Sequence, residues 1–255
     1  MNVKELYNFL DKKIPRELSA EWDNDGLMCA PTPEKEVKKV LVALDITEKT
    51  VKYAIAGGFD VILSHHPLIF KKIGALEPEK HVARKLIDLV KGDVAAMSFH
   101  TRLDAVEGGV NDVLAEKLSI KNAVPFGPTG EEMGRIGELD APMSLSDFCD
   151  KVKKALSAPF VLCADSGKPV KKVALLGGDG KDFAQSAIKA GADTYISGRI
   201  SYNVMAEAPE MGINLIEAGH FYTEDPVCVR LADLVREASP DIKAEIFNSN
   251  EIKVI

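Results

Sequence analysis

The strongest constraint on the fold of this chain is an internal repeat. Lys38-Lys39-Val40 recurs as Lys171-Lys172-Val173, 133 residues later. Three further matches keep that offset: Ala54-Ile55 with Ala187-Ile188, Asp60 with Asp193, and Ser64 with Ser197. His100 and Asp104 then match His220 and Glu224 at an offset of 120. Ordered matches at constant offsets predict two copies of strand, helix, strand, helix, strand, each ending in His-x-x-x-carboxylate.

Short β-branched runs alternate with helical patterns, which is typical of α/β layers with some parallel sheet. The expected strands are Val40–Leu44, Val61–Ser64, Val94–Ser98, Val173–Leu176, Thr194–Ser197 and Asn214–Glu217. Helical periodicity marks Thr47–Ala56 and Ala184–Ala190. Gly and Pro are dense in residues 125–146, which favours a crossing between two related α/β lobes at 1–124 and 147–255. This prediction allows the C-terminal segment to pack back on the first lobe.

Four of the five histidines end predicted strands. Two lobes facing each other would bring the two His-x-x-x-carboxylate ends together across a pseudo-twofold axis. The i, i+4 spacing is compatible with one helical face. However, Asp225-Pro226 is typical of a helix start, so His220 to Glu224 is expected to form a strand-to-helix loop.

These residue types indicate a metal centre. Imidazole and carboxylate groups suit Zn, Fe, Mn, Co or Ni. Four histidines and two acids exceed what one tetrahedral ion needs, and they fit two ions about 3.5–4 Å apart. The sequence therefore predicts two divalent transition-metal ions per chain. Their ligands would be His65, His66, His100, Asp104, His220 and Glu224.

Some of these residues also have a purely structural interpretation. A lone histidine at a strand end is more often a hydrogen-bonded structural residue, and His81, on a charged helical face, is expected to be solvated. Neighbouring strand residues point to opposite faces, so His65 and His66 need a turn imposed by Pro67 to face one region. Asp45 ends another strand and either caps the next helix or supports a metal ligand.

Two other segments are weaker candidates. In Trp22-Asp23-Asn24-Asp25-Gly26 an isolated Trp is usually core and the acidic stretch usually a turn, so we interpret the segment as structural. Gly177-Gly178-Asp179-Gly180 lacks the spacing of a dinucleotide or P-loop fingerprint and predicts a tight strand-to-helix turn.

Composition excludes several classes of function. A net charge of −7 argues against a broad nucleic-acid footprint. Lysines interrupt the amphipathic N-terminal helix, so it is not a signal peptide, and no run approaches the roughly 18 apolar residues of a membrane span. We expect a cytoplasmic protein. The four cysteines are scattered without a C-x-x-C pair, and we expect free thiols.

Several motifs extend along almost the whole chain. They are Trp22-x-Asn24-x-Gly26-Leu27, Ala43-Leu-Asp45-x-Thr47, Ser64-His-His-Pro-Leu-Ile-Phe70, His100-Thr-x-Leu-Asp104 with Gly109 and Asn111, Gly134-Arg135-Ile-Gly137-Glu-Leu139, Gly191-Ala-Asp193 and Gly219-His220-x-x-x-Glu224. The adjacent histidines and the late Gly-His-x-x-x-Glu are the most specific of these motifs. With this set the chain resembles the NIF-three-like family, whose members are often called GTP cyclohydrolase type 2 homologues.

The resemblance implies a two-lobe α/β fold with a dinuclear metal centre between the lobes. It assigns metal binding to His65, His66, Asp104, His220 and Glu224, and extends it to His100. It also implies dimers assembled into a toroidal homohexamer with the metal sites facing an internal cavity. Longer relatives carry an inserted PII-like domain, which the short Gly/Pro crossing suggests is absent here.

One stretch departs from the family pattern. Where the family usually has Thr-Gly-Glu and then a histidine-bearing segment, this chain has Ser197-Gly198-Arg199-Ile200-Ser201-Tyr202-Asn203. No implied metal ligand is lost, but Arg199 in place of an acid changes the charge near the site.

The first hypothesis for function is hydrolysis of a nucleotide-like or phosphoester substrate by a metal-bound hydroxide. One alternative is a non-catalytic metal-binding assembly or regulatory protein that acts through partners. A third is metal trafficking or storage. Metal-dependent turnover of a small-molecule substrate would discriminate the enzyme from both.

Overall fold

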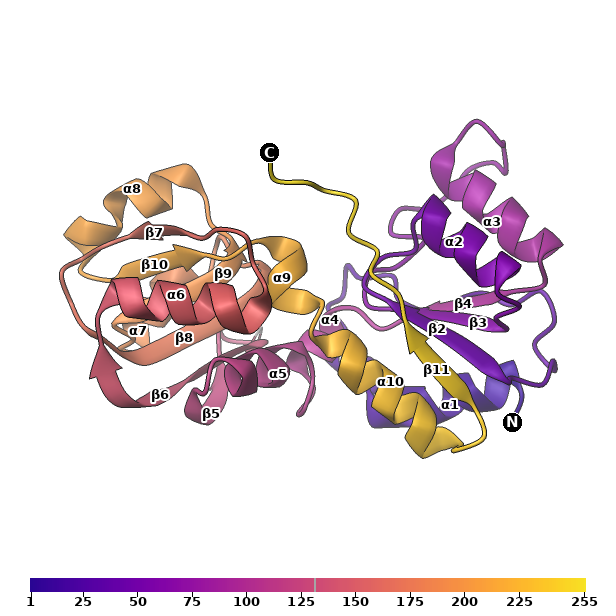
Figure 1. Ribbon diagram of the computed structural model, residues 1–255, viewed down its shortest axis with the longest axis horizontal. Coiled ribbons are helices and arrows are strands. Elements are labelled where there is room, and N and C mark those ends of the chain that lie inside the picture. The colour runs from indigo at the N-terminus through magenta and orange to yellow at the C-terminus, as the bar shows by residue number, and fades with distance from the viewer. Residues whose placement is uncertain (131) are drawn as a thin grey trace. The chain divides into compact units, whose positions relative to one another are not determined.

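The computed structural model describes residues 1–130 and 132–255, which form two compact units. The first unit comprises residues 1–103 and 228–253, and the second comprises 104–227 and 254–255. Each is a mixed α/β structure built on one sheet (Figure 1). The C-terminal segment joins the first sheet, which the sequence analysis allowed, and β6 belongs to the second unit instead of a separate crossing.

The first unit holds a five-stranded sheet of order β1-β4-β3-β2-β11, in which only β1 runs antiparallel to its neighbour. Its strands are β1 (Gly26–Cys29), β2 (Lys39–Ala43), β3 (Val61–Ser64), β4 (Ala95–Ser98) and β11 (Lys243–Ile246). Ala43 pairs with Ser64, and Ser64 pairs with Ser98. The carboxyl ends of three parallel strands therefore lie side by side, where open α/β sheets bind ligands.

Helices cover both faces of this sheet, with α2 and α3 on one side and α1 and α10 on the other (Figure 1). They are α1 (Val3–Lys13), α2 (Glu48–Ala56), α3 (His81–Lys91) and α10 (Val227–Ala238), with a 3-10 turn at Arg16–Leu18. The α2 helix begins at a capping box, in which Thr47 Oγ1 accepts a hydrogen bond from the Thr50 N–H at 3.1 Å. That cap fixes where the chain turns after β2.

The second unit holds a six-stranded sheet of order β5-β6-β8-β9-β10-β7, in which β8, β9 and β10 run parallel. Its strands are β5 (Lys121–Phe126), β6 (Gly134–Met143), β7 (Leu162–Ala164), β8 (Val170–Asp179), β9 (Thr194–Arg199) and β10 (Asn214–Glu217). Its helices are α4 (Thr101–Ala105, which begins in the first unit), α5 (Val110–Lys117), α6 (Leu145–Leu156), α7 (Ala184–Lys189), α8 (Tyr202–Met211) and α9 (His220–Glu224).

Alternating residues of the central strand of this sheet face two separate apolar cores. Val173 and Leu175 pack with buried residues of α5 and α6. Ala174 and Leu176 pack with buried residues of α7 and α8 on the opposite face. This alternation follows from the two-residue period of a strand, and it explains why Val173–Leu176 is an uninterrupted apolar run.

Within the predicted crossing at 125–146, Pro125 and Phe126 end β5 and Gly134–Met143 form β6, and the two strands pair antiparallel; residue 131 of this range lies outside the described residues. Their glycines allow the two strands to approach closely. A Cβ on Gly134 would collide with the Phe126 ring, and one on Gly137 would collide with the carbonyl oxygen of Lys121. The Gly density here marks tight strand packing, which composition alone does not distinguish from a linker.

Equivalent hydrogen bonds recur in the two units. The Lys39 N–H donates to the Asp60 carboxylate at 3.0 Å, and the Lys172 N–H donates to the Asp193 carboxylate at 2.7 Å. The two lysine ammonium groups also donate to carbonyl oxygens at the ends of α2 and α7, at 2.9 and 2.8 Å. Each unit thus makes the contacts that the repeat in the sequence predicts at an offset of 133.

These carboxylates are expected to stabilise their units. Asp60→Asn and Asp193→Asn should each lower the free energy of unfolding by about 1–2 kcal/mol, since each weakens hydrogen bonds to a charged acceptor. Burial raises the pKa of Asp60, but hydrogen bonds from backbone N–H groups and a lysine outweigh it and lower that pKa. The Asp60 contribution should therefore be present above the unfolded-state pKa and be lost as pH falls through the folded-state pKa. Urea unfolding measures the effect; a result equal to that of exposed Asp241→Asn would contradict it.

Two general expectations can be compared with the structure. Cys29, Cys149 and Cys163 are free thiols, as the sequence predicts. Within residues 1–130 and 132–255, no helix has both the length and the apolar character needed to cross a membrane.

Candidate metal centre

Three histidines converge at the carboxyl end of the first sheet. His65 and His66 directly follow β3, and His100 lies two residues beyond β4. The ring centroids of His65 and His66 are 4.9 Å apart, and those of His100 lie 5.3 and 5.7 Å from them. Each ring offers a nitrogen within 4.8 Å of the others, so this group has the spacing of metal ligands.

Adjacent histidines face one region because the strand ends before them. Ser64 is the last residue of β3, and its hydroxyl donates to the His66 carbonyl oxygen at 2.7 Å. The His66 N–H donates to the carbonyl oxygen of Leu44 at 3.0 Å. The chain therefore turns at His65-His66, and the alternation of a strand no longer applies.

Each imidazole is oriented through its Nδ1 atom. His65 Nδ1 lies 3.0 Å from the carbonyl oxygen of Phe99, and His66 Nδ1 lies 2.8 Å from Asp45 Oδ1. A carbonyl oxygen can only accept, so His65 Nδ1 carries the proton and the lone pair of the neutral ring is on Nε2. Metal-ligating histidines usually have such a partner on their other nitrogen. Asp45 was expected either to cap the next helix or to support a metal ligand; Thr47 caps that helix, and Asp45 contacts His66, a candidate ligand.

His100 is held by the acidic stretch that the sequence analysis interpreted as structural. Asp23 Oδ1 accepts from His100 Nδ1 at 2.9 Å, and its other oxygen accepts from the Thr101 hydroxyl at 2.6 Å. Asp25 accepts from the His100 N–H at 3.0 Å and from Arg102 Nε at 2.8 Å. Burial raises the pKa of Asp23, but the hydrogen bonds from His100 and Thr101 hold it well below its usual range. That interpretation was therefore incomplete, because both aspartates position a candidate ligand.

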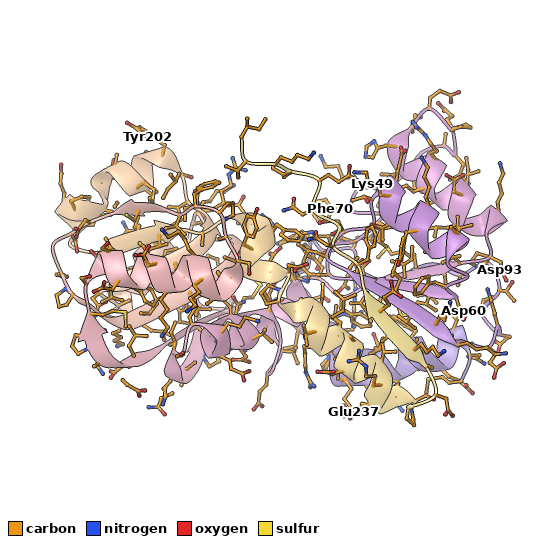
Figure 2. All side chains as sticks on the ribbon, in the orientation of Figure 1. Lys49, Asp60, Phe70, Asp93, Tyr202 and Glu237 are labelled. Atoms are coloured by element: carbon orange, nitrogen blue, oxygen red, sulfur yellow. The ribbon has the colours of Figure 1, made fainter. Side chains whose placement is uncertain are left out.

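Trp22 was expected to lie in the core, and the structure contradicts this. Its side chain is 62% exposed, and its ring lies 6.2 Å edge-on from that of His100. Phe70, labelled in Figure 2 and 48% exposed, lies 6.1 Å from both rings. Two exposed aromatic rings thus flank a candidate metal ligand. His81, expected to be solvated, is exposed at the start of α3.

His220 and Glu224 lie on α9 in the second unit. His220 Nε2 is 2.9 Å from Glu224 Oε2, and the side chains are 44% and 5% exposed. The predicted loop is wrong here, because these residues form a short helix that places positions i and i+4 on one face. Gly219, with φ +86°, allows the chain to turn from β10 directly into this helix. Asp225 ends α9, and the next helix begins at Val227.

Glycines of β8 make room for these two side chains. A Cβ on Gly178 would overlap Glu224 Oε1 and would lie 3.3 Å from His220 Nε2. The predicted tight strand-to-helix turn at Gly177–Gly180 is thus a cradle beside two candidate ligands. The repeat contained a signal for this role, since Gly178 corresponds at the offset of 133 to Asp45, which contacts His66.

Asp104, the remaining predicted ligand, is a buried residue on α4. Asn111 Nδ2 donates to the Asp104 carbonyl oxygen at 3.1 Å, and Asn111 Oδ1 accepts from the Gly177 N–H at 2.8 Å. A single buried amide therefore ties the segment that carries Asp104 to the glycines of β8.

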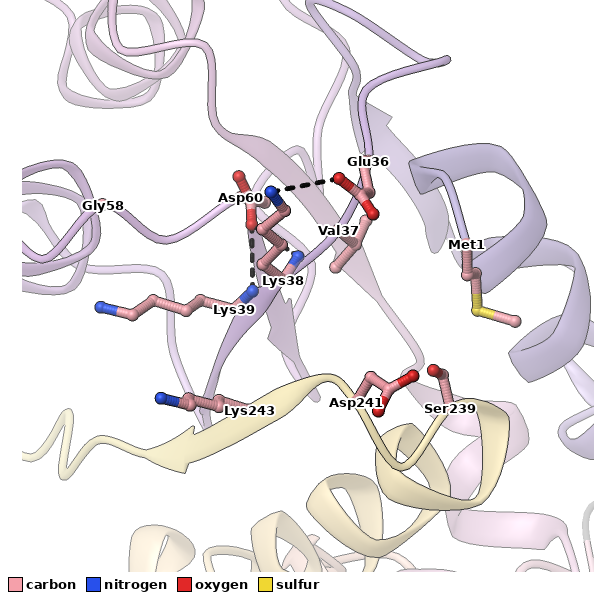
Figure 3. A pocket seen from close by; sticks show the side chains of 10 residues that line it. All are labelled: Met1, Glu36, Val37, Lys38, Lys39, Gly58, Asp60, Ser239, Asp241 and Lys243. Carbon is pink, nitrogen blue, oxygen red and sulfur yellow. Dashed lines mark hydrogen bonds and ion pairs between the residues drawn. The ribbon is translucent and has the colours of Figure 1, made fainter.

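A separate cavity of about 620 Å³ opens at the amino ends of β2 and β11 (Figure 3). Two of its acids already have partners: Asp60 accepts from backbone N–H groups, and Glu36 lies 3.2 Å from Lys38 Nζ. Neither histidine nor cysteine lines it. This cavity therefore lacks the donors that a transition-metal ion prefers.

Comparisons with known proteins agree with the fold and the motifs. The Duf34/NIF3 (NGG1p interacting factor 3) family model matches residues 1–253. The chain is 35% identical to the GTP cyclohydrolase 1 type 2 homolog of Clostridium perfringens, covering 99% of this chain and 98% of that protein. It is 32% identical to the Protein NIF3 homolog of Schizosaccharomyces pombe, with 94% and 90% covered.

Solved structures show the same architecture. Reduced HcgD from Methanocaldococcus jannaschii is 30% identical with a TM-score of 0.82, covering 96% of this chain and 97% of that one. A Bacillus cereus protein related to NIF3 is 24% identical with a TM-score of 0.89, covering 100% and 99%. The chain belongs to the Duf34/NIF3 family.

Proposed function

We propose that this protein is a metal-dependent hydrolase that uses two divalent transition-metal ions per chain. The observation that carries the proposal is the Nδ1 hydrogen bond of each clustered imidazole, which orients the three rings and directs a metal to Nε2. The proposed ligands are His65, His66, His100, Asp104, His220 and Glu224.

The donor set fits such ions. It contains imidazole nitrogens and carboxylate oxygens without a thiolate, which suits Zn, Fe, Mn, Co or Ni. When bound, the two ions would lower the pKa of a water towards about 7 and polarise the bond to be cleaved. Glu224 would be one of the ligands, because its side chain is nearly buried and its carboxylate lies 2.9 Å from Nε2 of His220, another proposed ligand.

The protein's own groups would orient the ligands and the substrate. Asp23 and Asp45 hold the rings of His100 and His66. Trp22 and Phe70 present aromatic surface beside His100, which suits a planar ring. A nucleotide-like or phosphoester substrate is therefore the class we propose. The relatives named GTP cyclohydrolase 1 type 2 homolog support the same choice.

Removing the partner of one ligand should weaken metal binding without unfolding the chain. Asp45→Ala is expected to lower Zn²⁺ affinity about 10–100-fold, because the His66 ring loses its orienting carboxylate. Asp45→Asn keeps a hydrogen-bond acceptor without the charge, so its Zn²⁺ affinity should lie between those of the unchanged chain and Asp45→Ala. Competition with a chromogenic chelator measures the affinity. Exposed Asp233→Ala is the control, and equal affinities in both alanine variants would argue against the role of Asp45.

The proposed activity is tested by turnover of nucleotides and phosphoesters with the protein loaded in turn with each metal. Metal-dependent product formation that is lost in Asp104→Ala and kept in exposed Asp150→Ala is the expected result. No turnover in any metal form would favour the alternatives, a metal-binding assembly or regulatory protein or a metal trafficking protein. Assembly into a toroidal homohexamer and a cytoplasmic location stay predictions.

A further inference from the structure

A second cavity, of about 610 Å³, lies within the second unit and includes His220 in its wall. Arg199 and Glu217 are the last residues of the parallel strands β9 and β10. Leu162 begins the antiparallel β7 and pairs with Glu217, so it lies at the same end of the sheet. The cavity therefore opens at the carboxyl ends of the strands.

One side of this cavity is apolar. Leu162, which is 53% exposed, contributes from β7, Ile200 lies two residues before α8, and Met205 lies in the first turn of that helix. Tyr202 is 88% exposed at the mouth and points away from the body of its unit (Figure 2). Such a wall favours the apolar part of a small organic molecule.

The cavity also holds a cation that the fold does not use. Arg199 is exposed, and it makes no ion pair or side-chain hydrogen bond among residues 1–130 and 132–255. The nearby carboxylate is turned to the backbone, because Glu217 Oε2 accepts from the Ile200 N–H at 2.7 Å. A guanidinium presents a planar fork of donors that matches a carboxylate or phosphate.

The repeat shows that this position belongs to the functional end of the sheet. At the offset of 133, Arg199 corresponds to His66, and Gly198 corresponds to His65. The first copy therefore carries candidate metal ligands where the second copy carries glycine and arginine. Guanidinium has no lone pair for a metal, so the residue at this position in the second copy is suited to an anion instead.

We propose that this cavity is a binding site for a small organic anion. Arg199 would bind a phosphate or carboxylate group of the ligand, and Leu162, Ile200 and Met205 would contact its apolar body. The wall of the site includes His220. A role for the site in catalysis therefore rests on the proposed function, and the substrate would then be an amphipathic anion. Binding itself needs only the cavity and Arg199.

The test uses the full chain after chelator treatment, so that its outcome does not depend on bound metal. Phenyl phosphate, benzoate, phenol and inorganic phosphate are titrated while amide chemical shifts are followed by NMR. We expect phenyl phosphate or benzoate to shift the Gly198 and Ile200 amides. Of these two aromatic anions, the one that binds better should bind about tenfold more tightly than phenol, and also more tightly than inorganic phosphate. Which of the two anions binds better identifies the charged group.

Matched variants locate the charge. Arg199→Ala should lose about tenfold in affinity for the preferred anion, and Arg199→Lys should recover part of it. Lys154→Ala removes one positive charge from an exposed site on α6 and should bind like the unchanged chain. The proposal would be overturned if Arg199→Ala bound the anion as tightly as the unchanged chain, or if Lys154→Ala lost as much affinity as Arg199→Ala. It would also be overturned if the chain showed no preference for the aromatic anion over inorganic phosphate. Anion binding with no turnover in any metal form would leave this site standing while the proposed hydrolase fails.

Discussion

Purified Glu224→Ala protein is expected to carry less than half of the metal of the unchanged chain, with Zn²⁺ affinity lowered at least about 100-fold. Glu224 is a proposed metal ligand, so its loss would remove a carboxylate from the centre. Its side chain is nearly buried, and its carboxylate lies 2.9 Å from His220 Nε2. Metal content after dialysis, measured by inductively coupled plasma mass spectrometry, gives the result.

Two comparisons make this prediction specific. Glu207→Ala changes an exposed glutamate of α8 in the same unit and should keep its metal. Glu224→Asp retains a carboxylate one methylene shorter and should bind metal with intermediate affinity. A thermal melt of each metal-free protein separates loss of a ligand from loss of the fold. Full metal content in folded Glu224→Ala would refute the assignment of Glu224.

Gly178→Ala is expected to damage both stability and the metal site. Gly178 has φ +68°, a conformation that costs an L-residue about 1–2 kcal/mol. The added Cβ would also overlap Glu224 Oε1 and approach His220 Nε2. We therefore expect a lower melting temperature, together with a loss of Zn²⁺ affinity of at least about tenfold. Differential scanning fluorimetry and chelator competition measure the two effects.

Gly167→Ala is the matched control, because Gly167 has φ +77° and nothing lies within 4 Å of an added Cβ. It should lose stability through backbone strain and should bind metal like the unchanged chain. If Gly178→Ala also kept its metal affinity, the cradle that Gly178 forms around Glu224 would not matter for the site.

The parts of the fold that follow local rules could be predicted from the sequence. The bounds of Val61–Ser64 and Asn214–Glu217 agree with the structure, because in each a few apolar residues lie between polar ones. Thr47, placed at the start of a predicted helix, is the cap of α2. The long strand β6 was missed, since Gly134 and Gly137 imitate a linker unless the neighbouring strand is known.

The candidate ligands could be named from sequence, but most of their partners could not. Residues at the ends of parallel strands meet at one end of a sheet, and this rule brings His65, His66 and His100 together. Asp23, by contrast, contacts His100 from 77 positions away in a segment that resembles an ordinary turn. The α9 helix was missed because Asp225-Pro226 is typical of a helix start, so His220 to Glu224 was predicted to be the loop before it. The positive φ of Gly219, which allows the chain to turn into α9, is not visible in the sequence.

A dinuclear transition-metal centre would give the unchanged chain a metal stoichiometry of about two ions per chain. The protein is stripped with chelator, reloaded separately with Zn²⁺, Mn²⁺, Fe²⁺, Co²⁺ or Ni²⁺, dialysed, and analysed by inductively coupled plasma mass spectrometry against protein concentration. We expect about two ions to be retained per chain with at least one of these metals. Retention of less than half an ion per chain with every metal would refute the dinuclear centre.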